Sequence, residues 1–419
     1  MFGKLILIPI LLIGACAGQD YGDLIASIFN QSAGLPTDTG DIVDTSTKLP
    51  PLVISPTPPA RQVATTTLAP IPLSPVGGHT YKPCGAGMEC VREYLCSNGK
   101  VNKDGATLID IRIDDNSCPF LETCCATGDT VSEPIVRPVD PPAGCGYRNI
   151  EGIGFKIEGA ADSEAEFGEF PWMVAILREE TAIDKVLNVY QCGGSLIAPT
   201  VVLTGAHCVQ ARKASNFKVR AGEWETNTKT EIYPDQDRQV VEMIVHEHYN
   251  KGSLYNDIAL LILESPFEEA PNVNTVCLPP VNTNFDMSRC FATGWGKDQF
   301  QNGKYQNILK KIDLPVVPNG KCQDNLRKTR LGKFFELHSS FMCAGGERGK
   351  DTCKGDGGSP LVCPMPNNPN RYFQAGIVAW GIGCGEENVP GVYASVPQLR
   401  SWIDEQLGYK RIDAKSFTP

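Results

Sequence analysis

The sequence predicts an all-β domain preceded by a small module that is held together by disulfides. The segment Gln239–His246 is rich in β-branched residues, which is typical of strands. Residues 84–125 contain six cysteines and are too few to fold on a hydrophobic core. The chain has 17 cysteines, and without Cys16 of the N-terminal leader the remaining 16 are enough for eight disulfides. This even number indicates an oxidising, extracellular environment.

Residues 1–18 have the pattern of a secretory signal peptide. A basic start at Lys4 is followed by the apolar run Leu5–Ile13 and by the small residues Ala15 and Ala17. The apolar run has about half of the roughly 20 residues that a membrane span needs, and we find no later stretch that is long enough. We therefore expect a secreted protein without a membrane span. The net charge of −10 argues against a nucleic-acid partner, because phosphate binding depends on clustered Lys and Arg.

Two segments are rich in proline and are predicted to lie outside the folded modules. Residues 19–83 have few aromatic side chains and many Pro, Thr and Ser, so we expect a disordered spacer. Asn30 begins an N-glycosylation sequon in this spacer, which is either used in a secreted chain or a chance match. Residues 126–144 return to a proline-rich composition and are predicted to form a linker.

The six-cysteine module at 84–125 ends in the adjacent pair Cys124 and Cys125 and precedes a protease-like sequence. In this it resembles the clip domain of arthropod haemolymph proteases. Partial alternation over Leu108–Ile113 favours strands of a small sheet. Cysteine spacing alone leaves the connectivity open. The resemblance implies the pairs Cys84–Cys124, Cys90–Cys118 and Cys96–Cys125. The module either displays a surface for partners or serves only as a spacer.

Residues 145–408 carry a series of motifs in the order typical of chymotrypsin-like serine proteases. These motifs are Phe170–Trp172, Cys192–Ile197, Leu203–Cys208, Asn256–Leu261, Ala292–Gly296 and Val378–Gly381. The resemblance implies two six-stranded β-barrels with the site between them. It also implies the disulfides Cys145–Cys277, Cys192–Cys208, Cys290–Cys363, Cys322–Cys343 and Cys353–Cys384. A helix is predicted over Pro397–Leu407 from apolar residues at helical spacing behind a proline, and residues 409–419 are predicted to be a C-terminal tail.

The segment Gly355–Leu361 aligns with the nucleophile loop of this family, Gly-Asp-Ser-Gly-Gly-Pro-Leu, and places Gly357 at the serine. His207 and Asp257 match the general base and the carboxylate that orients it. Catalysis of this type needs a hydroxyl beside the base, so Gly357 predicts a pseudoprotease. The alternative is a weak trypsin-like enzyme that uses Ser359. A two-residue offset can reach about 7 Å, whereas a nucleophile must lie within roughly 3 Å of its base.

The substrate pocket and the activation segment also have equivalents. Asp351, Gly381 and Gly391 match the acid and the walls of a pocket for a basic side chain, which is either still able to bind one or inherited without use. Asp356 matches the acid that pairs with the new N-terminus after activation. The equivalent cleavage position is Lys156, but Glu158 then places a charge where the family has an apolar residue, which makes insertion of that N-terminus doubtful.

Processing elsewhere and calcium binding are two further expectations. Arg92, inside the clip-like module, and Arg148 are candidate cleavage sites besides Lys156. Glu223, Asn227 and Glu231 lie in a loop matching the region where some family members hold Ca²⁺ with oxygen ligands. The loop is either such a site or a solvated acidic loop. We expect no cofactor to be required for catalysis.

The whole pattern resembles the serine protease homologues of the prophenoloxidase-activating factor II and masquerade-like group of arthropods. That resemblance implies a non-catalytic cofactor of melanisation in haemolymph. An upstream clip-domain protease would cleave it, and it would self-associate and bind prophenoloxidase or its activating serine protease. The other alternative is a pattern-recognition or adhesion protein that binds microbial polysaccharide or cell surfaces directly. The sequence does not separate the cofactor from the recognition protein.

Overall fold

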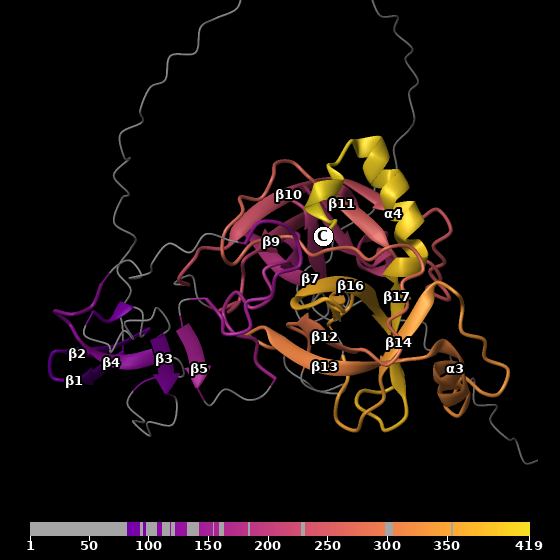
Figure 1. The fold of residues 1–419 in the computed structure, drawn as a ribbon. Helices are drawn as coiled ribbons and strands as arrows, with labels where there is room; N and C mark the ends of the chain where they lie inside the picture. Colours follow the sequence, from indigo (N-terminus) through magenta and orange to yellow (C-terminus); the bar gives the residue numbers. More distant parts are fainter. Residues whose placement is uncertain are drawn as a thin grey trace, which may run out of the picture. The chain divides into compact units, whose positions relative to one another are not determined.

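The computed structural model describes half of the predicted six-cysteine module and most of the protease-like domain (Figure 1). The described residues are 82–92, 95–97, 107–110, 118, 122–131, 142–153, 155–158, 163–182, 185–227, 231–297, 305–352 and 355–419. The predicted signal peptide, the sequon at Asn30, most of the spacer and most of the linker lie outside them. Among the described helices, none is long and apolar enough to cross a membrane.

The first barrel is a closed sheet in the order β10-β11-β8-β7-β6-β9. Its strands are β6 (Met173–Ala182), β7 (Lys185–Ala198), β8 (Val201–Thr204), β9 (Phe217–Ala221), β10 (Gln236–Val245) and β11 (Ala259–Leu263). All neighbouring pairs are antiparallel. The β-branched run predicted to be a strand forms most of β10. β8 is buried along its whole length, which fixes the position of the segment that follows it.

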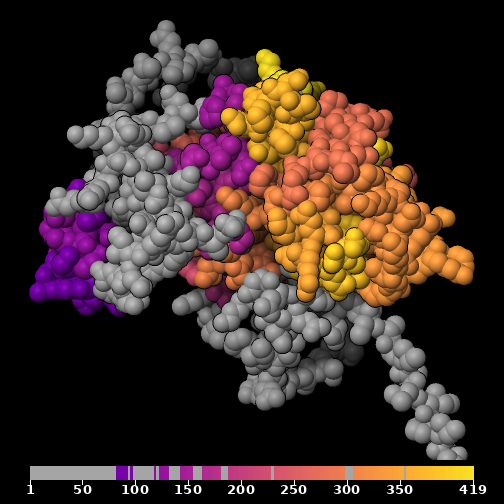
Figure 2. Space-filling model, turned by 60° about the horizontal axis from the view of Figure 1, so that its bottom comes forward, coloured from indigo at the N-terminus to yellow at the C-terminus, as the bar shows by residue number. Residues whose placement is uncertain are grey.

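The second barrel is a closed sheet in the order β12-β13-β14-β17-β16-β15. Its strands are β12 (Arg289–Gly294), β13 (Lys310–Val317), β14 (Phe341–Gly345), β15 (Pro360–Met365), β16 (Asn368–Trp380) and β17 (Pro390–Ser395). Figure 2 looks onto this side of the molecule, where the orange and yellow residues belong to the second barrel and its helices. The largest hydrophobic core contains residues of both barrels, among them Trp172 and Trp295. The predicted double-barrel fold is therefore confirmed.

The N-terminal module is a three-stranded antiparallel sheet of β1 (Pro83–Gly85), β2 (Met88–Arg92) and β4 (Glu122–Ala126). Its small core contains Val91, Leu95 and two half-cystines. A second, parallel pair joins β3 (Thr107–Asp110) to β5 (Phe155–Glu158). With so few apolar residues, covalent links rather than burial hold the module together.

Seven disulfides join the pairs implied by the resemblance. They are Cys84–Cys124, Cys90–Cys118, Cys96–Cys125, Cys145–Cys277, Cys192–Cys208, Cys290–Cys363 and Cys322–Cys343. Cys384 is also disulfide-bonded. Its predicted partner, Cys353, lies outside the described residues.

The C-terminal segment differs from the expectation of a tail. Helix α4 runs from Val396 to Lys410, with a proline in its first turn, and is followed by a 3-10 turn at Ala414–Ser416. Phe417 is 3% exposed and belongs to the main core. Its carbonyl oxygen accepts a hydrogen bond from the Leu278 N–H at 2.8 Å. The prediction of a tail was wrong because a single buried aromatic residue, beyond the helical pattern, returns the chain to the core.

Candidate functional site

The residues at the base and carboxylate positions come from two neighbouring strands of the first barrel. His207 lies in the short helix α2 (Ala206–Val209) after β8, and Asp257 lies just before β11, which pairs with β8. His207 Nδ1 is 2.6 Å from Asp257 Oδ2, and the His207 backbone N–H donates to Oδ1 at 2.9 Å. Burial lowers the pKa of His207, but the charge and hydrogen bond of Asp257 outweigh burial and raise the pKa overall. The pair has the geometry of a base oriented by a carboxylate.

Gly357 lies opposite the other ring nitrogen of this histidine. A Cβ atom added at Gly357 would lie 2.6 Å from His207 Nε2, which is closer than real Cβ contacts allow. The loop is fixed on both sides of this position. Gly357 O accepts from the Gly193 N–H at 3.0 Å, and the Gly358 N–H donates to Val378 O at 2.9 Å. A side chain at position 357 would therefore require the imidazole ring to shift.

Ser359, the other candidate nucleophile, is fully buried. Its hydroxyl packs against Gly193, where an added Cβ would lie 2.0 Å from Ser359 Oγ. Its backbone is also tied down, because the Ser359 N–H donates to Asp356 O at 3.0 Å and its carbonyl accepts from the Val378 N–H at 2.9 Å. A hydroxyl buried in this way does not face a substrate, which argues against the weak-protease alternative.

The loop before Gly357 is held by contacts with Gly296 and with two tyrosines, Tyr190 and Tyr305, that no sequence motif singles out. Asp356 Oδ1 accepts a hydrogen bond from the Gly296 N–H at 2.9 Å. The Tyr190 hydroxyl donates to Gly355 O at 3.1 Å. Gly355 has φ +104°, and a Cβ there would lie 2.8 Å from the ring of Tyr305. Burial, followed by the charge of Asp356, raises the pKa of Tyr190 well above its usual value, so this phenol remains a donor. Asp356 thus has a main-chain partner without a processed N-terminus.

The two carboxylate oxygens of Asp351, the residue that matches the acid of the substrate pocket, differ in their hydrogen bonding. Asp351 Oδ2 accepts a hydrogen bond from the Gly385 N–H at 3.2 Å. Within the described part of the chain, the buried Oδ1 atom has no hydrogen-bond partner. A Cβ at Gly391 would lie 3.0 Å from this oxygen, and a Cβ at Gly381 would have nothing nearer than 4.0 Å. Burial raises the pKa of Asp351 to about 6. A side chain at position 391 would therefore crowd this oxygen, whereas one at position 381 would not.

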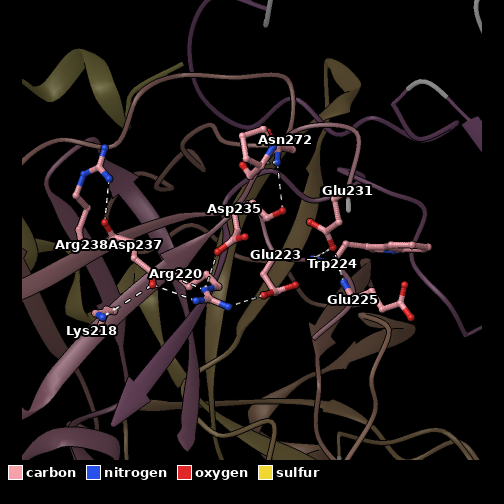
Figure 3. A network of polar contacts seen from close by, with 12 residues as sticks. Lys218, Arg220, Glu223, Trp224, Glu225, Glu231, Asp235, Asp237, Arg238 and Asn272 are labelled. Carbon is pink, nitrogen blue, oxygen red and sulfur yellow. Dashed lines mark hydrogen bonds and ion pairs between the residues drawn. The ribbon is translucent and has the colours of Figure 1, made fainter. Parts of the chain in front are cut away.

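The predicted calcium loop is part of a network centred on Arg220 (Figure 3). The Arg220 guanidinium contacts Glu223 at 3.0 Å, Asp235 at 3.0 Å and Asp237 at 2.7 Å. Glu231 Oε1 accepts two backbone N–H groups, at 2.7 and 3.1 Å. Burial and the charge of Glu223 nevertheless raise the pKa of Glu231 to about 8. The arginine balances part of the acidic charge of the loop, and the proton that Glu231 retains at neutral pH removes another part.

The calcium ligand set is only partly assembled in this network. Glu223 and Glu231 interact with each other, whereas Asn227 is exposed. Among the described residues, the clusters of side chains that could offer three thiol, imidazole or carboxylate ligands to a metal lie outside this loop. All of the cysteines in those clusters are disulfide-bonded. Calcium takes six to eight oxygen ligands. An ion here would therefore receive two carboxylates and would need main-chain oxygens for the rest.

The three candidate processing sites, Arg92, Arg148 and Lys156, lie in ordered parts of the structure. The Arg148 side chain is 8% exposed and forms a buried ion pair with Glu169. The Arg92 side chain, also 8% exposed, forms an ion pair with Glu225. Lys156 lies in β5, whose backbone pairs with β3. Since a protease binds an extended, unpaired segment and the side chain before the scissile bond, each site would have to open locally before cleavage.

Comparisons with known proteins agree with both modules. The trypsin family matches residues 161–403, and the serine protease clip domain PPAF-2 family matches residues 78–126. "Phenoloxidase-activating factor 2" of Galleria mellonella is 57% identical over 297 residues, covering 69% of this chain and 97% of that protein. "Inactive CLIP domain-containing serine protease A8" of Anopheles gambiae is 38% identical over 338 residues, covering 79% and 91%. "Protein masquerade" of Drosophila melanogaster is 36% identical over 262 residues, covering 61% and 24%.

Proposed function

The chain belongs to the trypsin family and carries a clip domain, and from this premise we propose that it is a non-catalytic serine protease homologue that supports activation of prophenoloxidase. The main support for the proposal is at Gly357, which has no nucleophilic side chain and lies next to the His207 ring. Relatives with the word "inactive" in their names support the lack of catalysis. A relative named "Phenoloxidase-activating factor 2" supports the pathway.

We propose that the protein works in haemolymph after secretion and processing. The disulfides, which need an oxidising compartment, support secretion. An upstream clip-domain protease would cleave the chain, and the processed form would self-associate and bind prophenoloxidase or its activating serine protease. Asp351 suits a basic side chain of such a partner, because its Oδ1 atom would gain a charge-assisted hydrogen bond.

A reconstitution tests cofactor function and lack of catalysis together. Prophenoloxidase and its activating protease are incubated with the full chain, before and after processing, and phenoloxidase activity is followed. We expect processed wild type and Ser359→Ala to raise this activity equally, with neither hydrolysing an arginyl ester. Loss of the effect in Ser359→Ala, together with loss of ester hydrolysis, would contradict a binding mechanism. No effect of either form would contradict the cofactor role.

The second candidate function is direct recognition of microbial polysaccharide or cell surfaces. It is favoured by carboxamide side chains, among them Asn282, Asn319 and Gln398, that line a cavity of about 400 Å³ on the second barrel. In the reconstitution, a recognition protein would have no effect in the absence of microbial material. The same assay repeated with washed bacterial cells separates the two functions, because only a recognition protein would then sediment with the cells without prophenoloxidase.

We also propose that Glu223 and Glu231 are the acidic ligands of a calcium site, with Asn227 as a third ligand after local rearrangement. The pKa of Glu231 supports this, because an added cation would relieve the repulsion between the two carboxylates. Calorimetric titration with Ca²⁺ tests the proposal. Binding with proton release at pH 7, lost in Glu231→Gln, is expected. No binding would show that the loop is an acidic network balanced by Arg220 alone.

A further inference from the structure

The loop of residues 328–337, which follows helix α3 (Asn319–Arg327), is held firmly on the outer edge of the second barrel (Figure 1). The disulfide Cys322–Cys343 joins the helix to β14. The Arg327 side chain donates a hydrogen bond to Phe335 O at 2.8 Å, which ties the loop back to the helix. The apolar residues of the loop that pack against the core beneath it are Leu331, Phe335 and Leu337. The remaining side chains of the loop are therefore presented outward in a defined arrangement.

One aromatic side chain of this loop lies in solvent. Phe334 is 86% exposed, although its neighbour Phe335 packs inward. Lys333 Nζ lies 4.9 Å from the centroid of the Phe334 ring. An exposed phenylalanine contributes little to folding, whereas aromatic side chains are enriched among the residues that dominate binding at protein interfaces. Phe334 is therefore a candidate anchor for a partner, provided that its surroundings also indicate a contact surface.

Cationic side chains are concentrated on the same helix and loop. Residues 319–338 contain five Lys or Arg and two acidic residues, in a chain whose net charge is −10. One of the two acids, Asp324, pairs with Arg327 at 3.6 Å. The other four cations are exposed, and none of them forms an ion pair within the described part of the chain. Together with Phe334 they make up what we call the basic surface: Lys321, Lys328, Arg330 and Lys333.

The first barrel carries a surface of the opposite charge. The segment 264–269 after β11 has three exposed glutamates, and among the described residues none of the three is in an ion pair. This segment is also held in place, because the Gln236 side-chain amide donates to Glu268 O at 2.9 Å. The Asn149 side chain donates to Pro271 O at 3.2 Å, which brings Ile150, 44% exposed, beside the segment. Together with Ile150, the glutamates make up what we call the acidic surface: Glu264, Glu268 and Glu269.

The two surfaces complement each other but do not meet within one copy. They belong to different barrels, and no ion pair between described residues joins them. We propose that the basic surface of one copy binds the acidic surface of a second copy, with Phe334 packed on Ile150. Burial of the aromatic ring supplies attraction, and the opposite charges around it steer the two copies and fix their register. This inference rests on the proposed self-association, for which it names the two contacting surfaces.

The proposed contact determines how an assembly grows. Because it joins two different surfaces, it is heterologous, and each dimer keeps one unused basic surface and one unused acidic surface. Further copies can therefore add until a ring closes or a filament forms. An assembly built in this way should contain species larger than a dimer.

Sedimentation velocity of the secreted protein after processing tests this inference. The measurement is made over a range of protein concentrations at about 50 mM and about 500 mM NaCl, because salt screens exposed charges. One variant reverses the charge of the basic surface by Arg330→Glu with Lys333→Glu. A second variant reverses the charge of the acidic surface by Glu268→Lys with Glu269→Lys. Each variant is measured alone, and the two are then measured as an equimolar mixture.

Two matched controls separate the proposed contact from general effects of charge and apolar area. Arg348→Glu with Lys415→Glu changes the net charge as much as the basic-surface variant does, at two exposed positions outside both surfaces. Phe334→Ala removes the anchor, and Tyr409→Ala removes another exposed aromatic ring, which is 71% exposed. All substituted side chains are exposed, and thermal unfolding checks that each variant is folded.

We expect wild type to associate beyond the dimer, and to associate less at the higher salt concentration. Each charge-reversed variant alone should remain monomeric at concentrations at which wild type associates. Their mixture should associate again, because each variant retains the surface that the other has lost. Phe334→Ala should weaken association about tenfold, as expected for loss of an aromatic anchor. Both controls should behave like wild type.

Three results would overturn the inference: a wild type that is monomeric at every concentration, association that either charge reversal leaves unchanged, or a mixture of the two variants that stays monomeric. Phenoloxidase reconstitution with the same samples distinguishes this failure from failure of the proposed function. A monomeric wild type that still raises phenoloxidase activity would contradict the inference alone. An associating wild type without effect on that activity would contradict the cofactor role alone.

Discussion

At the scale of single residues, restoring the missing hydroxyl should not restore catalysis. In Gly357→Ser the new Cβ would overlap His207 Nε2, because a Cβ at this position lies only 2.6 Å from that nitrogen. We therefore expect no hydrolysis of an arginyl ester and no labelling by a serine-directed fluorophosphonate, before or after processing. Gly357→Ala is the matched control, since it adds the Cβ without the hydroxyl. Labelling of the serine variant alone would show that the imidazole moves aside easily and that Gly357 is the sole defect.

Asp351 should make stability depend on pH. Its folded pKa of about 6 is above the ordinary value of 3.8, so the folded state binds the proton more tightly than the unfolded state. The carboxyl therefore costs no stability below pH 4. The cost grows as pH rises from about 4 to about 6 and is complete above that. At about 1.4 kcal/mol per pKa unit, it reaches roughly 3 kcal/mol.

Asp351→Asn is expected to be more stable than wild type at pH 7.5, by up to about 3 kcal/mol, and to differ little at pH 4. Urea unfolding at the two pH values measures this difference. Asp324→Asn, in an exposed position on α3, is the control. An equal effect of Asp351→Asn at both pH values would mean that lost packing, rather than ionisation, determines its stability.

At the scale of elements, the C-terminal segment beyond α4 should contribute to folding. Phe417 is 3% exposed and packs in the main core. The centroid of its ring lies 5.3 Å from Cζ of the Arg400 guanidinium. Phe417→Ala should destabilise the domain by about 3 kcal/mol, as expected for deleting a buried aromatic ring. Tyr409→Ala is the matched control, because this aromatic residue is 71% exposed at the end of the same helix. Similar unfolding midpoints for the two variants would show that the segment is a dispensable tail.

The elements that sequence could predict are those marked by local patterns or by family motifs. β10 follows from its β-branched run, and α4 from a proline and apolar residues at helical spacing. The positions of His207 and Asp257 follow from their flanking motifs. The partners of Arg148 and Tyr190 could not be predicted from such motifs, because the tertiary fold brings Glu169 to Arg148 and Gly355 to Tyr190. Burial of a cleavage site or of Phe417 depends on the same long-range packing, which composition and periodicity do not encode.

At the scale of the whole molecule, the disulfides determine whether processing separates the two modules. In the pairs found in the structure, the clip-domain cysteines bond only with one another, and Cys145 bonds with Cys277 inside the large domain. A cut in residues 132–141 would therefore release the clip domain. A cut after Arg92 would not release it, because the cut lies between Cys90 and Cys118, which are bonded to each other. Cuts after Arg148 or Lys156 would not separate the fragments either, because they lie between the bonded Cys145 and Cys277.

We therefore expect the processed protein to run as one band without reductant and as two bands with it. Mass spectrometry of the reduced fragments identifies the cut, and Arg92→Gln, Arg148→Gln and Lys156→Gln should each block cleavage only at its own position. Local opening must come first, because the Arg92 and Arg148 side chains are held in ion pairs. Cleavage should accordingly speed up under mild destabilisation, such as about 1 M urea, while the protein remains folded. Two bands without reductant would place the cut in the linker and would mean that activation frees the protease-like domain from its clip domain.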